Sequence, residues 1–113
     1  MSGISTHVLD TALGKAAAEV PVLLEYWQPG IGWKILGRAT TDADGRCRDL
    51  TREHTLSEGL HRLTFDAGAY FKLREAETFF PEVVVVFDVR DANAHHHVPL
   101  LLSPYGYSTY RGT

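Results

Sequence analysis

The chain has 113 residues, of which 44% are hydrophobic, 11% aromatic and 22% charged, and its formal net charge is −3. This length is typical of one domain, which we expect to span residues 1–113, and the composition excludes a disordered or collagen-like chain. The slight negative charge gives no electrostatic reason to expect a nucleic acid or a membrane surface as a partner.

The cysteine content is typical of a reducing compartment, and the apolar runs predict neither a signal peptide nor a membrane span. Cys47 is the only cysteine, which excludes an intramolecular disulfide and is typical of proteins kept in a reducing environment. The first residues carry neither a basic stretch nor a long apolar run, and the longest apolar run, residues 83–87, is too short to cross a bilayer. We therefore expect a soluble, cytoplasmic protein.

Alternation of apolar and polar residues predicts most of the secondary structure, because a period of two places successive side chains on opposite faces of a β-strand. It predicts strands at residues 5–10, 20–26, 33–40, 60–65, 83–89 and 97–103. The run at 83–89 is rich in β-branched valine, so we expect a central strand there. Pro99 has no N–H, which predicts an edge position or an irregularity in the last strand.

Turn signals and one helical segment lie between these strands. Residues 28–32, QPGIG, predict a hairpin turn, and residues 41–45 predict a turn in which Gly45 adopts a positive φ. Residues 69–76 are good helix formers, and Pro81 limits how far that helix can extend. Short strands, frequent turns and one helix together predict an all-β sandwich.

Histidine is frequent in this chain, with six residues, three of which are consecutive. His95 and His97 share one face of the last predicted strand. An adjacent triplet without a second ligand cluster lacks the spacing of a zinc site, so we predict no physiological metal and interpret the triplet as a solvated strand end or an adventitious metal binder. His7 precedes Val8 in an alternating segment, and if Val8 faces the core, His7 lies on the outer face.

Two further groups of residues are candidates for binding a small polar ligand. Arg46 and Arg48 share a strand face, where two guanidinium groups can clamp an anion or an oxygen-rich ring, although such a pair is also ordinary surface charge. Residues 105–113 carry three tyrosines and several hydroxyls. Chain ends are usually polar and frayed, so this composition predicts that the tail packs against another surface.

Several motifs together resemble the 5-hydroxyisourate hydrolases, the enzymatic branch of the transthyretin-like proteins. The motifs are STHVLD at residues 5–10, GKAA at 14–17, TDADGR at 41–46, YF at 70–71, FFPE at 79–82 and HVPLLLSPYGYSTYRGT at 97–113. The last motif is long and specific, and the resemblance extends over essentially the whole chain.

This resemblance implies a transthyretin-like sandwich of two four-stranded sheets with one short α-helix. It also implies a homotetramer, assembled as a dimer of dimers around a central channel, with active sites at the dimer–dimer interface. The implied reaction is hydrolysis of 5-hydroxyisourate to 2-oxo-4-hydroxy-4-carboxy-5-ureidoimidazoline, a step of urate degradation that needs no cofactor.

The resemblance further implies a set of site residues. The catalytic residues of the family correspond to His7, Arg46 and His97; the two histidines would move protons and the arginine would stabilise the oxyanion. The tail signature Tyr-Arg-Gly-Ser is matched by four residues that, with Ser108, are expected to bind substrate: Tyr110, Arg111, Gly112 and Thr113. Threonine in place of the last serine keeps a hydroxyl and adds a methyl group.

Two other classes of function are compatible with the fold. A transthyretin-like carrier of a small aromatic ligand would share it, because a fold alone does not determine function. The carrier branch, however, lacks the Tyr-Arg-Gly tail and has a more apolar channel. A structural or interaction module would have no need for His7, Arg46, His97 and the tail together, so their co-occurrence favours the hydrolase.

Overall fold

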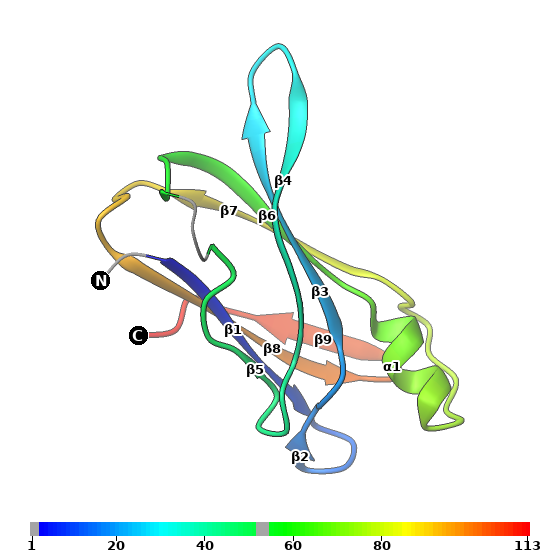
Figure 1. Cartoon of the computed structure of the whole chain (residues 1–113). Helices are drawn as coiled ribbons and strands as arrows, with labels where there is room; N and C mark the ends of the chain where they lie inside the picture. Colours follow the sequence, from blue (N-terminus) through cyan, green and yellow to red (C-terminus); the bar gives the residue numbers. More distant parts are fainter. Residues whose placement is uncertain (1–2, 52–54) are drawn as a thin grey trace.

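The computed structural model describes residues 3–51 and 55–113 and contains two β-sheets packed face to face, with a short helix at one end (Figure 1). The strands are β1 (Gly3–Asp10), β2 (Lys15–Ala16), β3 (Pro21–Gln28), β4 (Gly32–Thr40), β5 (Arg46–Cys47), β6 (Gly59–Phe65), β7 (Val83–Val89), β8 (His95–Ser103) and β9 (Gly106–Thr109). The helix is α1 (Ala67–Leu73). Within the described ranges, no helix is long and apolar enough to cross a membrane.

Each sheet is built around an internal pair of strands. In the first sheet the order is β2-β1-β8-β9, with β5 also paired to β1, and in the second sheet the order is β4-β3-β6-β7. The β1 and β8 strands pair in parallel, whereas the other paired strands are antiparallel. The predicted all-β sandwich is confirmed. The first sheet has five strands rather than four, because the two-residue β5 adds to β1.

The hydrophobic core lies between the sheets and is filled by alternate residues of the inner strands. Val8, Leu63, Phe65 and Leu100 are fully buried there. Burial of each such side chain stabilises the fold by roughly 1.5–3 kcal/mol. Their neighbours in sequence point away from the core, so the same alternation determines which residues form the outer face of the first sheet.

Helix α1 is anchored to the first sheet by Tyr70, whose buried hydroxyl donates a 2.7 Å hydrogen bond to Asp10 Oδ2. The helix begins after Asp66, whose carboxylate accepts a backbone N–H of the first turn at 2.9 Å. It ends before Glu75, which adopts a left-handed φ of 55°. The predicted range 69–76 was therefore too late in the chain, because the Asp66 cap and the Glu75 conformation determine the two ends.

The prediction that residues 83–89 form a central strand was wrong. The β7 strand pairs with β6 on one side, and no described strand pairs with its other edge. Val83 and Val89 are buried, whereas Val84 and Val86 are exposed. A valine-rich run favours a strand, but its number of neighbours depends on segments that are distant in sequence.

Pro99 was predicted to lie either on an edge strand or at an irregularity, and the structure shows an irregularity. It is not on an edge strand, since β8 lies between β1 and β9. Pairing of β8 with β9 stops at Leu100 opposite Thr109 and resumes as an isolated bridge between His97 and Gly112. The interruption falls where proline has no N–H to donate.

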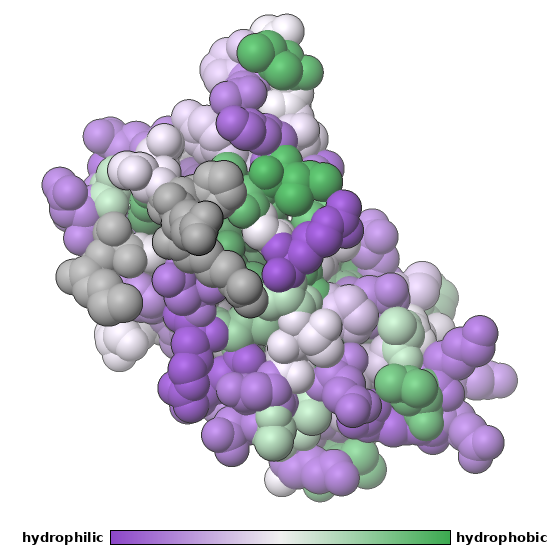
Figure 2. Space-filling model, viewed as in Figure 1, coloured by the Kyte–Doolittle hydropathy of each residue, from purple (hydrophilic) through white to green (hydrophobic). Residues whose placement is uncertain are grey.

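The predicted hairpin at residues 28–32 is confirmed, and it joins β3 to β4 at the end that projects from the sandwich (Figure 1). The Ile31 N–H donates to the Gln28 carbonyl at 3.0 Å, and Gly30 adopts a φ of 80°. Ile31 is 82% exposed, and Figure 2 shows hydrophobic residues at this tip.

Candidate active site

The three residues predicted to be catalytic lie on the outer face of the first sheet. His7 is on β1, Arg46 on β5 and His97 on β8. His7 pairs with Arg46 on one side and with Pro99 on the other, while Ser5 pairs with His97. Residues that pair across neighbouring strands share a face, so the fold brings segments from both ends of the sequence to one place.

The turn before β5 positions Arg46 beside β1. The Asp42 Oδ1 atom accepts the backbone N–H of Arg46 at 3.0 Å and that of Asp44 at 2.9 Å, and the bond from Arg46 in particular lowers the pKa of Asp42. Gly45 adopts a φ of 77°, and a Cβ at this position would lie 2.4 Å from the Val8 carbonyl oxygen. The predicted turn is confirmed, and glycine is required where it meets β1.

A pocket of about 280 Å³ opens beside His97. Its lining residues are Ser5, Thr6, Arg46, Cys47, Arg48, His95, His97 and Thr113. Thr113 reaches the pocket because the Gly112 N–H donates a 2.8 Å hydrogen bond to the His97 carbonyl and holds the tail against β8. The pocket therefore combines two guanidinium groups, two imidazoles and hydroxyl groups.

Electrostatics keep His97 in its neutral form. Burial lowers the pKa of His97 below its usual value near 6.5, the positive charge of Arg46 lowers it further, and repulsion between protonated rings of His7, His95 and His97 acts in the same direction. At neutral pH the ring therefore has a lone pair that can accept a proton. His7 is not among the lining residues, but it lies close enough to His97 to contribute to this effect.

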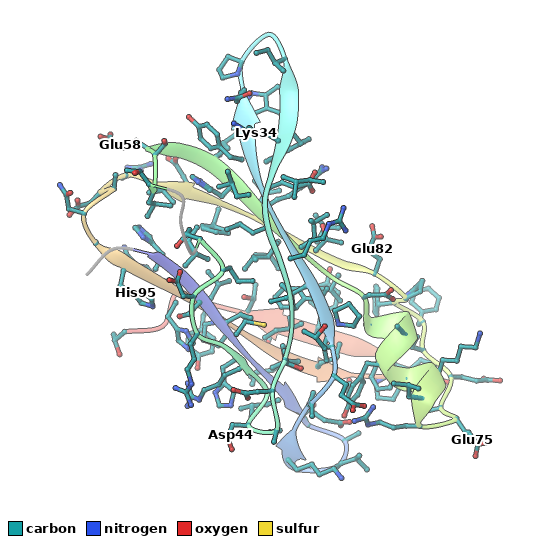
Figure 3. The ribbon with its side chains drawn as sticks, viewed as in Figure 1. Lys34, Asp44, Glu58, Glu75, Glu82 and His95 are labelled. Carbon is teal, nitrogen blue, oxygen red and sulfur yellow. The ribbon has the colours of Figure 1, made fainter. Side chains whose placement is uncertain are left out.

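Ser5 and His95 belong to the site but were not predicted. The Ser5 hydroxyl lies 2.8 Å from His97 Nδ1 and 2.8 Å from His95 Nε2. Ser5 is buried, whereas His95 is exposed beside the start of β1 (Figure 3). A sequence signal was present, since Ser5 has the same strand parity as His7, and His95 has the same parity as His97.

Of the five residues predicted to bind substrate, only Thr113 lines this pocket, and Gly112 lies next to it on the tail. Ser108 is exposed on the outer face, where it pairs with Leu101. Tyr110 and Arg111 line a separate pocket of about 230 Å³ with His96 and with part of β7. The tail is therefore divided, with residues 110–111 directed toward β7 and residues 112–113 directed toward His97.

The histidine triplet divides between the two faces of β8, as the strand parity predicted. His95 and His97 lie on the outer face, whereas His96 points the other way and is buried. In the part of the chain that the structure describes, no three His, Cys, Asp or Glu side chains are grouped as they would be around a metal ion.

Comparison with known proteins adds to this geometry. The model of the HIUase/Transthyretin family matches residues 4–112. The chain belongs to this family. Within the HIUase/Transthyretin family, the 5-hydroxyisourate hydrolase of Caulobacter vibrioides is 47% identical over 117 residues, which cover 100% of both proteins.

Solved structures of the HIUase/Transthyretin family include both branches. A 5-hydroxyisourate hydrolase of Klebsiella pneumoniae superposes with a TM-score of 0.87 at 34% identity, covering 100% of both chains. Sea bream transthyretin in complex with thyroxine superposes with a TM-score of 0.90 at 29% identity, covering 97% of this chain and 94% of that one. The fold is thus equally close to both, and the distinction has to come from the site.

Proposed function

We propose that this member of the HIUase/Transthyretin family hydrolyses 5-hydroxyisourate to 2-oxo-4-hydroxy-4-carboxy-5-ureidoimidazoline. The observation that carries the proposal is the pocket in which a neutral His97 lies beside Arg46 and Arg48. A volume of about 280 Å³ suits a small polar heterocycle. The 47% identity to a named hydrolase supports the same conclusion, and among the solved structures the identity is 34% to the hydrolase and 29% to the thyroxine-bound transthyretin.

The proposed mechanism assigns proton transfer to His7 and His97. A neutral imidazole takes a proton from the attacking water, and an imidazole returns one to the ring nitrogen that leaves. The Arg46 guanidinium donates hydrogen bonds to the substrate oxygen that becomes negatively charged in the tetrahedral intermediate. The reaction needs no cofactor, because imidazole and guanidinium groups supply both the proton transfer and the charge stabilisation.

The tail residues are proposed to complete the substrate site. Thr113 lines the His97 pocket of the same chain, and the hydrogen bond from the Gly112 N–H to the His97 carbonyl holds it there. Ser108, Tyr110 and Arg111 lie outside that pocket, so we propose that they contribute to binding when a second subunit covers the outer face. The site is then complete only in the assembled protein.

A homotetramer is the proposed assembly, formed as a dimer of dimers. Two features support it. One is the edge of β7 that no described strand pairs with, where Val84 and Val86 are exposed; the other is the neighbouring end of β9, since residues from both strands line one pocket. Pairing of such edges between two copies would satisfy their backbone groups. We place the protein in the cytoplasm, with a small-molecule substrate and with neither nucleic acid nor membrane as a partner.

The deciding experiment generates 5-hydroxyisourate from urate with uricase and follows its ultraviolet decay with and without this protein, in the presence of a chelator. We expect the protein to accelerate the decay, and His97→Ala to slow turnover by about 10²- to 10⁴-fold. Decay at the spontaneous rate would contradict the proposal and favour the carrier alternative. Direct binding measurements with thyroxine-like ligands would then test that alternative.

A further inference from the structure

One serine hydroxyl joins two histidines on the outer face. Ser5 Oγ is 2.8 Å from His97 Nδ1 and 2.8 Å from His95 Nε2, and both distances are those of short hydrogen bonds. A hydroxyl has a single proton, so Ser5 can donate to only one of the two rings and has to accept from the other. The tautomers of His95 and His97 are therefore coupled through Ser5.

This coupling allows two arrangements. In the first, His97 Nδ1–H donates to Ser5, Ser5 donates to His95 Nε2, and His97 Nε2 is left with a lone pair. In the second, His95 Nε2–H donates to Ser5, Ser5 donates to His97 Nδ1, and a neutral His97 carries its proton on Nε2. The hydrogen bond to the Ser5 hydroxyl uses His97 Nδ1, and His97 lines the pocket, so we assign Nε2 to the substrate.

We propose that Ser5 and His95 form a proton relay that carries the positive charge away from His97 during each turnover, an inference that rests on the proposed hydrolase function. The attacking water forms a bond to the substrate carbonyl carbon and gives its proton to His97 Nε2. The proton on His97 Nδ1 passes to Ser5, and the Ser5 proton passes to His95 Nε2. His97 is then neutral, with a proton on Nε2 that it can donate.

The second half of the reaction reverses the relay. The carbon–nitrogen bond of the substrate breaks, and the leaving nitrogen takes the proton from His97 Nε2. His95 Nε2 returns its proton to Ser5, and Ser5 returns its own to His97 Nδ1. All three side chains regain their starting states, and the net change is the addition of one water molecule to the substrate.

The surroundings of His97 disfavour a positive charge on its ring. His97 is partly buried and faces the positive charge of Arg46, and both features lower its pKa. His95 is exposed. Asp49 Oδ1 and His95 Nδ1 lie 3.5 Å and 3.8 Å from the point where a Cβ of Gly3 would stand, so both border the space beside Gly3. In this scheme Ser5 and His95 are positioning residues that act through His97.

The first test is kinetic and uses the whole chain. Ser5→Ala removes the hydroxyl and should lower kcat by roughly 10- to 100-fold, less than the 10²–10⁴ of a general base, with little change in KM. Ser5→Thr keeps the hydroxyl and should recover most of the rate. His95→Gln keeps a hydrogen-bond partner for Ser5 but cannot carry the proton, so kcat should again fall. Ser57→Ala makes the same chemical change at an exposed position and should leave the rate unchanged.

The second test reads the protons directly and does not depend on activity. Nitrogen-15 spectra of labelled histidine should show neutral His97 protonated on Nδ1 in the resting protein, and Ser5→Ala should abolish this preference. A resting His97 protonated on Nε2, or a His95→Gln variant with wild-type kcat, would overturn the relay. A wild-type chain that does not accelerate decay of 5-hydroxyisourate would overturn the proposed function instead, and the spectra would still decide whether the two rings are coupled.

Discussion

Gly112 lies directly against the imidazole of His97, and no side chain fits between them. Its N–H donates to the His97 carbonyl at 2.8 Å, and a Cβ at Gly112 would lie 2.5 Å from His97 Cδ2 and 3.2 Å from Pro99 Cγ. Since Ser5 holds the opposite side of the ring through Nδ1, His97 has little freedom to move away. The tail therefore fixes one side of the ring and Ser5 fixes the other.

The first prediction concerns this contact. Gly112→Ala should force the tail away from His97 or turn the ring, and we expect a loss of kcat/KM of at least about 10-fold, since small misplacements at a reacting centre are costly. The melting temperature should change little because the tail is mostly exposed. Gly106→Ala is the matched control, since a Cβ there would meet only Ser103 Oγ, at 3.8 Å. Wild-type kinetics in Gly112→Ala would contradict the proposed role of the contact.

The second prediction concerns pH. His97 has to be neutral to accept a proton, so kcat/KM should fall as the pH falls through its lowered pKa, which lies below 6.5. Arg46→Ala removes a positive charge that lowers this pKa, so the acid limb should move to higher pH, in addition to a loss of roughly 10²- to 10³-fold in kcat. Arg90→Ala, which removes an exposed arginine paired with Asp88 at 3.2 Å, should leave the profile unchanged. An acid limb that stays in place in Arg46→Ala would show that another group titrates.

The third prediction concerns the anchor of α1. Burial raises the pKa of Tyr70 to about 12, and the bond to Asp10 adds to this effect. Tyr70→Phe removes a 2.7 Å hydrogen bond to Asp10. It should lower the free energy of unfolding in urea by roughly 1.5–3 kcal/mol, the range for a bond to a charged group. Tyr105→Phe, at an exposed tyrosine, should change it by less than about 0.5 kcal/mol. Equal effects of the two variants would contradict this account.

The fourth prediction concerns a buried histidine in the core. Burial lowers the pKa of His61; the charge of His96 acts in the same direction, whereas the Gly59 carbonyl and Asp88 oppose it. The unfolded chain therefore binds a proton below about pH 6.5 that the folded chain resists, so stability should fall as the pH falls through this range. His61→Phe preserves the ring that packs against Phe87 and should reduce this loss.

The measurement for His61 compares urea unfolding at about pH 7.5 and about pH 5.5 in the wild type and in His61→Phe. The pH dependence should decrease without vanishing, because burial also lowers the pKa values of His96 and His97. An unchanged difference between the two pH values would show that His61 does not contribute.

The sequence predicted the sandwich because alternation is a local property, which β1 and β8 show clearly: Val8 and Leu100 are buried, while His7 and His97 lie on the other face. It did not predict that β7 lies at an edge, because the number of neighbouring strands is decided by pairing between distant segments. The helix also begins earlier than predicted, because its N-cap, Asp66, lies before the run of good helix formers on which the prediction was based.

The site was predictable to the extent that it follows strand parity and motif. His7, Arg46 and His97 lie together on one face, as parity and the resemblance implied. Ser5 and His95 were not predicted, because their hydrogen bonds depend on two distances that only the paired strands create. The division of the tail at Arg111 and Gly112 depends on a backbone hydrogen bond to β8, which no composition or spacing reveals.

The parallel pairing of β1 with β8 has a consequence for folding. Ser5 and His97 are 92 positions apart in sequence, and the register between them forms only when nearly the whole chain has closed into one loop. Such topologies fold slowly, because the entropy cost of closing a long loop comes before the stabilising contacts form. Recovery of catalysis during refolding should therefore be among the last events, and it should lag behind formation of the local β3–β4 hairpin. A chain released early from the ribosome could pair β1 with β2 and β5 but would lack β8, and hence His97 and the site.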